Sequence, residues 1–393
     1  MSVNHVIGIF SPEHGGPVVS MRNYAMEQAR RGHDVRVYTI EGYPNTSPAV
    51  RLAPPVRQIV SPLAWPAALG RSPVLRAALR AAPAADVYHL HGIWLRAMFY
   101  GWEKARATRR PYLIEINGAL DPLELATKPW RKRLVRCWYQ DRMLREAPCI
   151  HVNSTREARH LRALGFATPL AVIPAGFNVA EFYALAQQAS AIQPSWGAPL
   201  HGRRVLLYLA RIHPAKGIDD LLVAWNDLAP AFPDWDLLIV GPGSPEEVQK
   251  GQAHVAQAGL QQRCVWAGTV TDVERAWAYT RAELYVLPSH KENFGNTVQE
   301  ALGYGTPVVT TMQTPWTDLE QRNCGWVCPD NALSLRETLG RALASPAGEL
   351  QEKGRHGRAM ILEHFSLASV VDQQLAVYAW LQGGPVPACV SFL

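Results

Sequence analysis

The chain has 393 residues, which is enough for two domains that each bury a core of their own. A hydrophobic content of 48% with 18% charged residues is typical of a globular protein and excludes a disordered chain. The net charge of +6 is uneven: residues 1–200 hold 24 Lys and Arg against 13 Asp and Glu, whereas residues 201–393 hold 15 against 20. A basic half suits nucleic acid, an anionic membrane or an acidic substrate, but no basic helix with repeating aromatics follows, so we expect no nucleic-acid partner.

The N-terminal residues MSVNHVIGIF pass directly into an apolar strand, without the charged region and cleavage site of a signal peptide. No run reaches the roughly 18 apolar residues of a membrane-spanning helix. The six cysteines are spread along the chain, and Cys324 with Cys328 offer too few ligands for a zinc site. We therefore expect a cytoplasmic protein, with a peripheral position at the inner face of the plasma membrane as a variant of that expectation.

The first predicted unit is a strand over residues 5–10, a turn with Gly15 and Gly16, a helix that ends at Gly32, and a strand over residues 35–39. This order opens a parallel, doubly wound sheet. The Gly15-Gly16 turn would let a ligand approach the backbone at the helix N-terminus, although such turns also serve tight packing. The first domain is therefore expected to be Rossmann-like. Its further strands are predicted over residues 87–90, 112–116 and 150–152.

A histidine stands at the carboxyl end of the strand predicted over residues 87–90. His91 follows that strand, two residues after His89. Ligands of open parallel sheets bind beyond the carboxyl ends of strands, which makes His91 a candidate ligand contact. The alternatives are a histidine packed in the core and a metal pair with His89, and the absence of a nearby carboxylate cluster disfavours the metal.

Residues 121–136, DPLELATKPWRKRLVR, form a strongly basic segment in which Trp130 and Leu134 add apolar surface. A solvated helix face accounts for such a segment. The functional alternative is contact with an anionic lipid surface or with an acceptor that carries a pyrophosphate. The candidate acceptor-side residues are Asn117, Lys128, Arg131, Lys132 and Arg133.

Residues 182–202 hold no Asp, Glu, Lys or Arg but contain loop-forming Pro and Gly, which predicts a linker. The second domain then opens with a strand over residues 205–209. Arg211 and Lys216 bracket the loop at the carboxyl end of this strand, where two cations can reach two phosphate groups. An ordinary surface loop remains the alternative.

Glycine turns follow the next two strands. Gly241 and Gly243 come after a strand over residues 237–240, but they lack the third glycine of a dinucleotide fingerprint, so NAD is not expected. Thr269 lies in the turn after the next strand, where another helix opens. We count Gly241 and Thr269 among the candidate ligand contacts.

Asp234 and Asp236 resemble a metal-binding carboxylate pair. They precede their strand, however, and therefore lie at the edge of the sheet away from ligands. We interpret them as part of a turn and expect no metal and no cofactor.

Residues 288–310, PSHKENFGNTVQEALGYGTPVVT, form the most informative stretch of the chain. A helix that begins at Asn296, after Gly295, would direct free backbone N–H groups and its positive dipole end at a phosphate. Glu292 precedes this helix and Glu300 lies within it. The stretch therefore predicts a nucleotide-diphosphate site with one carboxylate for ribose hydroxyls and one for a sugar.

Six motifs in this order resemble the glycosyltransferases of family 4, retaining enzymes with the GT-B fold of two Rossmann-like, doubly wound domains facing across a cleft. The resemblance covers nearly the whole chain and rests on Gly15 to Pro17, His89 to His91, Val172 to Pro174 with Gly176, Arg211 to Gly217, Gly241 to Gly243, and the two glutamates with Gly305 to Pro307. It implies an acceptor-side domain over residues 1–180, a linker over 181–203, a nucleotide-sugar domain over 204–365, and a last helix near 366–383 that crosses back to the first domain. Ala175 and Phe177 depart from the commoner motif tail, which leaves acceptor and sugar details open.

The resemblance also implies roles for individual residues. Arg211 and Lys216 would bind the diphosphate, joined by the backbone at Gly295, Asn296 and Thr297 next to Phe294. Glu300 would hold the ribose, Glu292 would contact the donor sugar, His91 would stand over that sugar, and Gly16 would approach its phosphate. The reaction implied is transfer of a hexosyl unit from a UDP- or GDP-sugar to a saccharide acceptor, lipid-linked in the interpretation that the basic segment favours, in cell-surface polysaccharide or glycolipid biosynthesis.

Three alternatives stay open on the same residues. A non-hydrolysing nucleotide-sugar epimerase would need no acceptor. A glycan phosphorylase would use pyridoxal phosphate, and no lysine stands in a setting that suggests a Schiff base. A non-catalytic nucleotide-sugar-binding subunit would keep the binding residues without turnover.

Overall fold

The computed structural model describes residues 1–392 and divides the chain into two compact units. The first unit comprises Met1–Gly176 together with the described residues from Leu367 onward, and the second comprises Phe177–Ser366. Residues 181–203, expected as a linker, lie within the second unit, and helix α8 (Val179–Ala189) extends into this segment. Phe182 of α8 packs against Phe177 and Tyr304, whereas most other residues of this segment are exposed.

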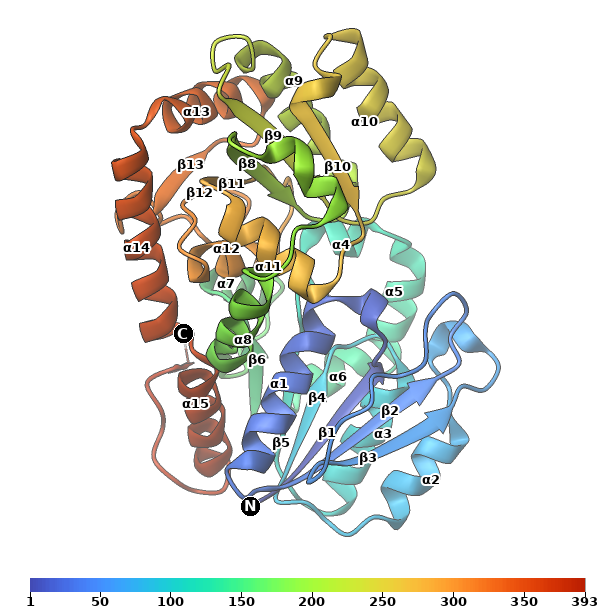
Figure 1. The fold of residues 1–393 in the computed structure, drawn as a ribbon. Helices are drawn as coiled ribbons and strands as arrows, with labels where there is room; N and C mark the ends of the chain where they lie inside the picture. Colours follow the sequence, from blue (N-terminus) through green and yellow to red (C-terminus); the bar gives the residue numbers. More distant parts are fainter. Residues whose placement is uncertain (393) are drawn as a thin grey trace. The chain divides into compact units, whose positions relative to one another are not determined.

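Within residues 1–392, the first unit is built on an eight-stranded sheet in the order β14-β7-β6-β5-β4-β1-β2-β3, parallel except for β14. Figure 1 shows this unit with the N-terminus at its lower edge. Its strands are β1 (Ser2–Ile9), β2 (Asp34–Glu41), β3 (Arg57–Pro62), β4 (Val87–His91), β5 (Tyr112–Glu115), β6 (Cys149–Val152), β7 (Leu170–Val172) and β14 (Val390–Ser391). Its helices are α1 (Gly16–Arg30), α2 (Pro73–Ala81), α3 (Arg96–Ala107), α4 (Pro122–Ala126), α5 (Pro129–Val135), α6 (Asp141–Arg145), α7 (Thr155–Ala163) and α15 (Leu367–Trp380). Two short 3₁₀ turns, η1 (Pro12–His14) and η2 (Ala67–Leu69), and a π-helical segment, η3 (Arg136–Gln140), complete the unit.

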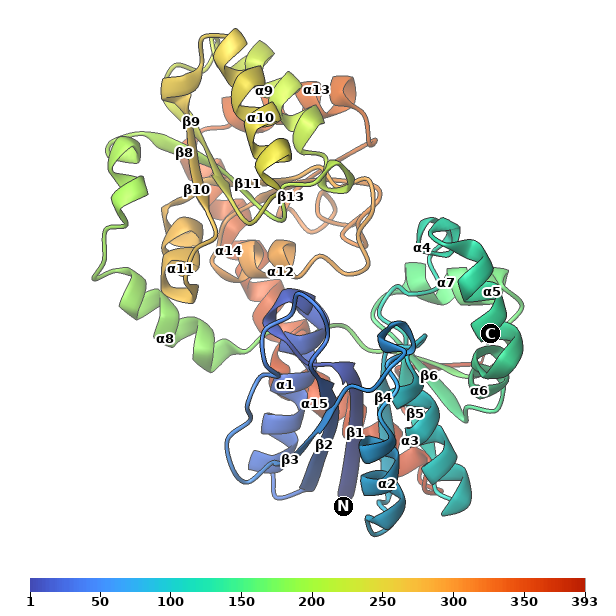
Figure 2. The ribbon, with the colours of Figure 1, turned by 90° about the vertical axis from the view of Figure 1, so that its right-hand side faces the viewer.

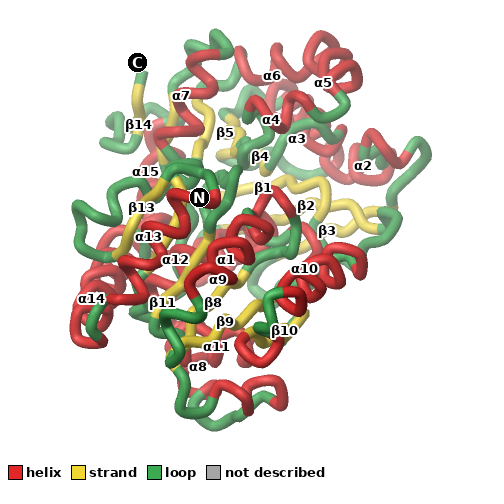
Figure 3. Tube along the Cα trace, turned by 90° about the horizontal axis from the view of Figure 1, so that it is seen from above, coloured by secondary structure: helices red, strands yellow, loops and turns green. Residues whose placement is uncertain are grey.

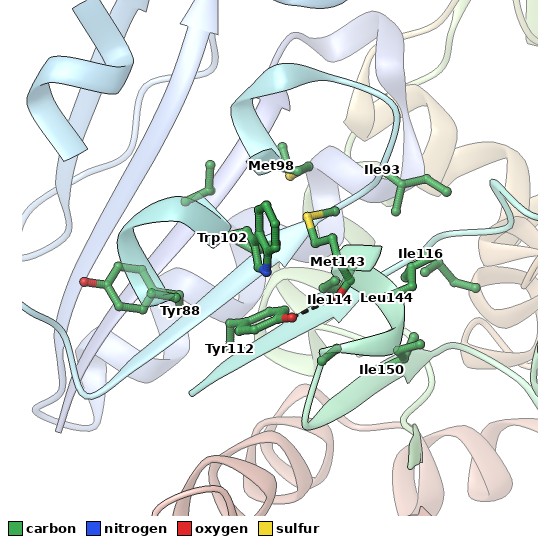
Figure 4. Close-up of a cluster of buried hydrophobic side chains, with 14 of the residues drawn as sticks. Tyr88, Ile93, Met98, Trp102, Tyr112, Ile114, Ile116, Met143, Leu144 and Ile150 are labelled. Atoms are coloured by element: carbon green, nitrogen blue, oxygen red, sulfur yellow. Dashed lines mark hydrogen bonds between the residues drawn. The ribbon is translucent and has the colours of Figure 1, made fainter. Parts of the chain in front are cut away.

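The two faces of this sheet bury different layers, because side chains alternate along each strand. One face carries an apolar core with Tyr88, Ile114 and Trp102, shown in Figure 4, where the Tyr112 hydroxyl donates to the Met143 carbonyl at 2.9 Å. The opposite face lies against α1 and α15, which pack side by side (Figure 1). The last helix of the chain therefore completes the core of the first unit.

The second unit is built on a six-stranded parallel sheet in the order β10-β9-β8-β11-β12-β13, counted over the same described residues. Helix α9 packs against α10 and α13, whereas α12 packs against α14 and α11 against α8 (Figure 2). Its strands are β8 (Arg204–Leu209), β9 (Trp235–Val240), β10 (Cys264–Gly268), β11 (Leu284–Leu287), β12 (Val308–Thr311) and β13 (Gly325–Cys328). Its remaining helices and turns are η4 (Ser195–Leu200), η5 (Pro214–Lys216), α9 (Ile218–Leu228), α10 (Pro245–Gln257), η6 (Gln261–Arg263), α11 (Asp272–Arg281), α12 (Asn296–Gly303), α13 (Ala332–Ala344) and α14 (Ala347–His364).

Both sheets reverse their strand order at one point, and in each unit the strands run between helices (Figure 3). In the first unit β2 and β3 follow on one side of β1, while β4 to β7 follow on the other. In the second unit β9 and β10 lie on one side of β8, and β11 to β13 on the other. Ligands of open α/β sheets bind beyond the carboxyl ends of strands at such reversals. A ligand site is therefore expected at the carboxyl ends of β1 and β4 and of β8 and β11.

The fold is the predicted one, two Rossmann-like units with parallel sheets. Among the described residues, no helix is both long enough and apolar enough to cross a membrane.

Candidate functional site

Two loops of the second unit meet beyond the ends of β8 and β11. One runs from β8 to α9 and carries Lys216, and the other runs from β11 to α12 and carries Glu292. The backbone N–H of His290 in the second loop donates to the Ala215 carbonyl in the first at 3.1 Å. Gly217 has a φ of 71°, and a Cβ atom there would lie 1.9 Å from the Pro288 carbonyl oxygen. Only glycine therefore allows the backbones of the two loops to approach this closely at Gly217 and Pro288.

Lys216 and Glu292 form an ion pair at this junction. The Lys216 Nζ lies 2.5 Å from the Glu292 Oε2, and the two side chains are 19% and 15% exposed. Arg211 lies at the start of the same loop with its side chain exposed, while its backbone carbonyl accepts from the Tyr208 hydroxyl at 3.1 Å. The structure thus brings together the cation and the carboxylate that the sequence assigned to neighbouring parts of one ligand.

Helix α12 begins at Asn296, as the sequence predicts, and its cap Gly295 has a left-handed φ of 82°. The Trp316 indole N–H donates to the Phe294 carbonyl at 2.6 Å and holds the turn before the helix. The Phe294 side chain is buried against Trp316 and Phe365, so it contributes to the core. Only the backbone of Phe294 therefore lies near the start of the helix. The start of the helix and its dipole remain suited to an anion.

Thr297 connects α12 to the end of β8. The Tyr285 hydroxyl lies 3.0 Å from the Leu209 carbonyl and 2.8 Å from the Thr297 Oγ1. Because a carbonyl only accepts, Tyr285 donates to Leu209 and accepts from Thr297. This buried link aligns the helix start with the strand end that precedes Arg211.

Glu300 is anchored by residues of α11 that the sequence reasoning missed. Its Oε2 accepts from the Tyr279 hydroxyl at 2.9 Å, and its Oε1 lies 3.8 Å from the Arg275 Nη1. The charge of Glu300 raises the pKa of Arg275 above its ordinary range. The Tyr279 ring stacks on the Tyr304 ring at a centroid distance of 5.2 Å. In the sequence, the i, i+4 spacing of Arg275 and Tyr279 places both side chains on one helix face, and this spacing could have indicated them as partners of Glu300.

Gly241 and Thr269 lie at the same edge of the sheet in different settings. The Gly241 N–H donates to the Gly268 carbonyl at 2.8 Å, and a Cβ atom on Gly241 would lie 2.0 Å from the Ala210 carbonyl oxygen. Close packing therefore requires glycine at position 241. Thr269 is exposed just after β10.

Of the two aspartates considered for a metal, Asp234 lies in the expected turn, whereas Asp236 does not. Asp236 is a buried residue of β9. Its Oδ2 lies 2.8 Å from the Arg203 Nε and its Oδ1 lies 2.7 Å from the Arg263 Nε. Both carboxylate oxygens are thus engaged by guanidinium groups, because a buried carboxylate needs such partners.

In the first unit, Gly15 and Gly16 form the start of α1. Gly15 is the helix cap, with a φ of 61°, and α1 begins at Gly16. A Cβ atom on Gly15 would meet nothing within 4 Å. Backbone conformation, rather than crowding, therefore favours glycine there, and the space beside it is open.

His91 lies at the end of β4 inside a buried polar layer, whose hydrogen-bonded members are His5, Gln28, His89, His91, Glu115, His151, Gln374 and Tyr378. Its Nδ1 lies 2.5 Å from the Glu115 Oε2, and its Nε2 lies 2.8 Å from the Nδ1 of His5. The sequence reasoning found no carboxylate beside the histidine pair, but parallel pairing sets Glu115 next to His91 in the adjacent strand. Both ring nitrogens of His91 are therefore used within the layer.

Titratable groups in this layer have strongly shifted pKa values. Burial lowers the pKa of His5 to about 3 and that of His89 well below its ordinary value. Burial alone would raise the pKa of Glu115, but the neighbouring His151 and His91 lower it to about 2. Two sets of ligand atoms, those of His5, His89 and His91 and those of His89, Glu115 and His151, lie within 4.8 Å of one another. Hydrogen bonds already join most of these atoms, so we interpret them as partners of one another rather than as ligands of a metal ion.

Asn117 follows β5 in a left-handed conformation with a φ of 50°. Its side-chain carbonyl accepts from the Asn153 amide at 2.9 Å. Nearby, Glu157 accepts from the backbone N–H groups of Asn153, at 2.7 Å, and Gly118. Burial raises the pKa of Glu157 to about 7. Asn117 therefore belongs to a hydrogen-bonded junction between the ends of two strands.

The basic segment splits into paired and exposed cations. Lys132 lies 2.8 Å from the Glu124 Oε1 and sits over the Trp94 ring. Lys128, Arg131 and Arg133 are exposed. Beside them runs an exposed apolar stripe at helical spacing, made of Trp130, Leu134 and Trp138, which are 62%, 63% and 60% exposed.

The predicted site residues are divided between the two units, and the following groups are defined by unit only. The group in the second unit comprises Arg211, Lys216, Gly241, Thr269, Glu292, Phe294, Gly295, Asn296, Thr297 and Glu300. The group in the first unit comprises Gly15, Gly16, His91, Asn117, Lys128, Arg131, Lys132 and Arg133. Each group lies in the unit to which the sequence assigned it.

Comparison with known proteins agrees with this division. Residues 15–176 match the family model "Glycosyl transferase 4-like domain", and residues 195–357 match "Glycosyl transferases group 1". The chain is 30% identical over 266 residues to an MMP alpha-(1->4)-mannosyltransferase of Mycolicibacterium hassiacum, a match that covers 64% of this chain and 60% of that protein. The chain therefore spans less than two thirds of the length of that relative.

Solved structures show the same fold at low sequence identity. A sucrose-phosphate synthase from Thermosynechococcus elongatus superposes with a TM-score of 0.76 at 21% identity, covering 98% of this chain and 99% of the other. Anabaena HepE, solved in complex with UDP and glucose, superposes with a TM-score of 0.73 at 16% identity, covering 97% and 100%. With a glycosyltransferase model matched in each unit and this fold over nearly its whole length, the chain belongs to the GT-B glycosyltransferases.

Proposed function

We propose that the chain is a retaining glycosyltransferase that moves a hexosyl unit from a UDP- or GDP-sugar to a saccharide acceptor, without a metal ion. The observation that carries this proposal is the junction at the β8 and β11 ends, where Lys216 lies 2.5 Å from Glu292 beside the start of α12. A diphosphate fits the cations and the helix N-terminus, and a sugar hydroxyl fits the carboxylate. The complex of HepE with UDP and glucose supports a donor of this class.

The proposed chemistry follows from where charge develops. When the bond between the anomeric carbon and the phosphate oxygen breaks, the electron pair stays on the diphosphate. Arg211, Lys216 and the α12 N–H groups stabilise that charge more in the transition state than in the ground state. The departing phosphate oxygen takes the proton of the acceptor hydroxyl, which attacks from the same face, so that the anomeric configuration is retained. Glu300 holds the ribose and Glu292 the donor sugar.

Replacement of Lys216 or Arg211 by Ala should lower turnover by about 100-fold or more, because each variant removes one of the two cations proposed to stabilise the leaving group. Lys250→Ala is the matched control, since Lys250 forms an exposed pair with Asp219 on the same unit. Thermal-shift titration with UDP, GDP and their sugars should first identify the nucleotide. Transfer at normal rates in either variant would contradict the assignment of the cations.

Two controls separate the alternatives. Product analysis without acceptor distinguishes transfer from epimerisation, because an epimerase converts the donor alone. Activity should persist in EDTA, and loss of activity that Mn²⁺ restores would contradict metal independence. A protein that binds the nucleotide sugar but turns over no acceptor would be a binding subunit.

For the acceptor side we propose contact with an anionic membrane surface through α5 and η3. The stripe of Trp130, Leu134 and Trp138 offers apolar side chains, and Lys128, Arg131 and Arg133 beside it offer positive charge. This combination is typical of interfacial helices, which insert aromatics and keep cations at the headgroups. A lipid-linked saccharide would be reached from such a position.

Flotation with vesicles that contain phosphatidylglycerol tests this contact. The double variant Trp130→Ser, Trp138→Ser should lower the floated fraction by about tenfold, because two inserted aromatic side chains are lost. Trp65→Ser is the matched control, since Trp65 is 84% exposed elsewhere on the first unit. Absence of flotation for the unmodified chain at low salt would refute the membrane contact, whatever the outcome for transfer.

A further inference from the structure

The buried polar layer under α1 and α15 has a bonding pattern that determines where its protons lie. It begins at the Ile173 carbonyl, which lies 2.9 Å from the Nε2 of His151. A carbonyl only accepts, so the proton of His151 is on Nε2. Burial lowers the pKa of His151, so its ring is neutral and its Nδ1 is an acceptor.

His89 connects His151 to Tyr378 of α15, and the same donor and acceptor argument applies to it. The Nε2 of His89 lies 3.4 Å from the Nδ1 of His151, the longest link of the layer together with one at Gln28. His89 must donate from Nε2, and because its ring is neutral its Nδ1 accepts. The Tyr378 hydroxyl, 2.7 Å from that Nδ1, is therefore the donor to His89.

Tyr378 in turn sets the orientation of the Gln28 amide. With its proton given to His89, the Tyr378 oxygen accepts from the Gln28 Nε2 at 3.4 Å. The second amide proton of Gln28 goes to the Gln374 Oε1 at 3.0 Å. Both donors of Gln28 are thus used on α15, and its Oε1 faces His5 at 2.9 Å from the Nε2.

The pattern ends at His91 and Glu115. Because the Gln28 Oε1 only accepts, His5 carries its proton on Nε2, and its Nδ1 is an acceptor in the neutral ring. His91 must then donate from Nε2 to His5 across 2.8 Å. One further proton lies between the Nδ1 of His91 and the Oε2 of Glu115, which are 2.5 Å apart.

We propose that this layer holds His91 as an imidazolium, protonated on both ring nitrogens and paired with the Glu115 carboxylate. Glu115 is the charged partner because, although burial raises the pKa of its carboxyl, the hydrogen bond and the charge of His91 lower it. The pair is neutral overall, whereas a buried carboxylate beside neutral histidines would be uncompensated. The other titratable groups that face the pair are His5, His89, His151, Glu157, Tyr24 and Tyr378.

The consequence for transfer rests on the proposed function. An imidazolium has no free lone pair, so His91 cannot act as a general base towards an acceptor hydroxyl. Both of its N–H groups are used inside the layer, which makes His91 a positioning residue under the reversal point between β1 and β4. Gln28 and Tyr378 act through it.

Nitrogen-15 NMR of the full chain with labelled histidine tests the protonation state directly. At about pH 8, where an ordinary histidine is neutral, one ring should show protons on both nitrogens, and that signal should disappear in His91→Gln. A neutral His91 in the unmodified chain would overturn the proposal. So would one equivalent of bound metal that is lost with His89→Gln.

Two variants should change His91 in opposite ways. In Glu115→Gln the amide donates to Nδ1, so His91 should become neutral with its proton on Nε2. In Tyr378→Phe the Gln28 amide is released and can turn, so His5 can donate from Nδ1 and His91 should become neutral with its proton on Nδ1. Tyr112→Phe is the matched control, because it removes a buried hydroxyl from the opposite face of the sheet and should leave the imidazolium signal unchanged. The same neutral tautomer in both variants would refute the bonding order.

These readouts do not depend on transfer. If no sugar transfer is detected, the spectra still report the protonation state of His91. If the spectra agree and the chain does transfer sugar, Glu115→Gln should lower kcat while leaving the UDP or GDP thermal shift unchanged, because the proposed nucleotide site lies in the other unit.

Discussion

At the scale of single residues, the loop that carries Lys216 depends on the absence of a side chain at Gly217. The left-handed φ of 71° and the distance of 1.9 Å that an added Cβ would have to the Pro288 carbonyl oxygen are separate reasons for glycine. The first costs an L-residue about 1–2 kcal/mol, whereas the second requires the two loops to move apart. Since Lys216 precedes this glycine and Glu292 lies on the facing loop, any such movement would separate the ion pair.

Gly217→Ala should therefore destabilise the chain by about 3 kcal/mol or more in denaturant unfolding and weaken binding of the nucleotide sugar. Gly259→Ala is the matched control on the same unit, with a φ of 70° and nothing within 4 Å of the added Cβ. It should cost only the backbone term of about 1–2 kcal/mol and leave binding intact. If both variants lost the same free energy of unfolding, the close approach to Pro288 would make no contribution to stability.

At the scale of elements, the pattern of strand, glycine turn and helix predicted the sheets and the start of α12 at Asn296. The short strands β3 and β7 and the helix α8 were not predicted from the sequence, because each is stabilised by packing rather than by a periodic pattern of its own. Candidate residues at strand ends could be located, since parallel strands share one edge. Their partners could not: Glu115 meets His91 only through the register of β4 and β5, which the local sequence does not encode.

The buried polar layer between the sheet and helices α1 and α15 should make the stability of the folded chain sensitive to acid. His5 has a pKa of about 3 in the folded chain against 6.5 in the unfolded chain, so between these values the unfolded state binds more protons. Stability should therefore fall as the pH drops from 6.5 towards 3, by up to about 1.4 kcal/mol per pH unit for this one residue. His89 and His151 shift in the same direction.

Denaturant unfolding at about pH 7.5 and about pH 5 checks this expectation. The stability difference between the two conditions should shrink by about 2 kcal/mol in His5→Gln, because that variant removes one buried base. Comparing the two conditions within each variant cancels any loss that the substitution causes at neutral pH. An unchanged pH dependence would mean that His5 is protonated in the folded state.

At the scale of the whole molecule, the chain order and the unit order differ, because the last helix belongs to the first unit. Helix α15 buries Val370, Val371, Val377 and Tyr378 against the sheet and α1. It also supplies the hydroxyl and the amide that complete the buried polar layer. The first unit is thus assembled from two distant stretches, which makes its stability depend on synthesis of the complete chain.

A chain that ends at Ser366 should leave the first unit unfolded while the second keeps its core. Burial of the four α15 side chains contributes about 1.5–3 kcal/mol each, a sum comparable to the whole stability of a domain, about 5–15 kcal/mol. A chain that ends at Pro387 is the matched control: it keeps α15 and removes β14, whose pairing with β7 is two residues long. That control should lose no more than about 2 kcal/mol, since few hydrogen bonds are removed. Proteolysis followed by mass mapping would separate the two outcomes, and a protected first unit in the chain that ends at Ser366 would show that the sheet and α1 are sufficient without the last helix.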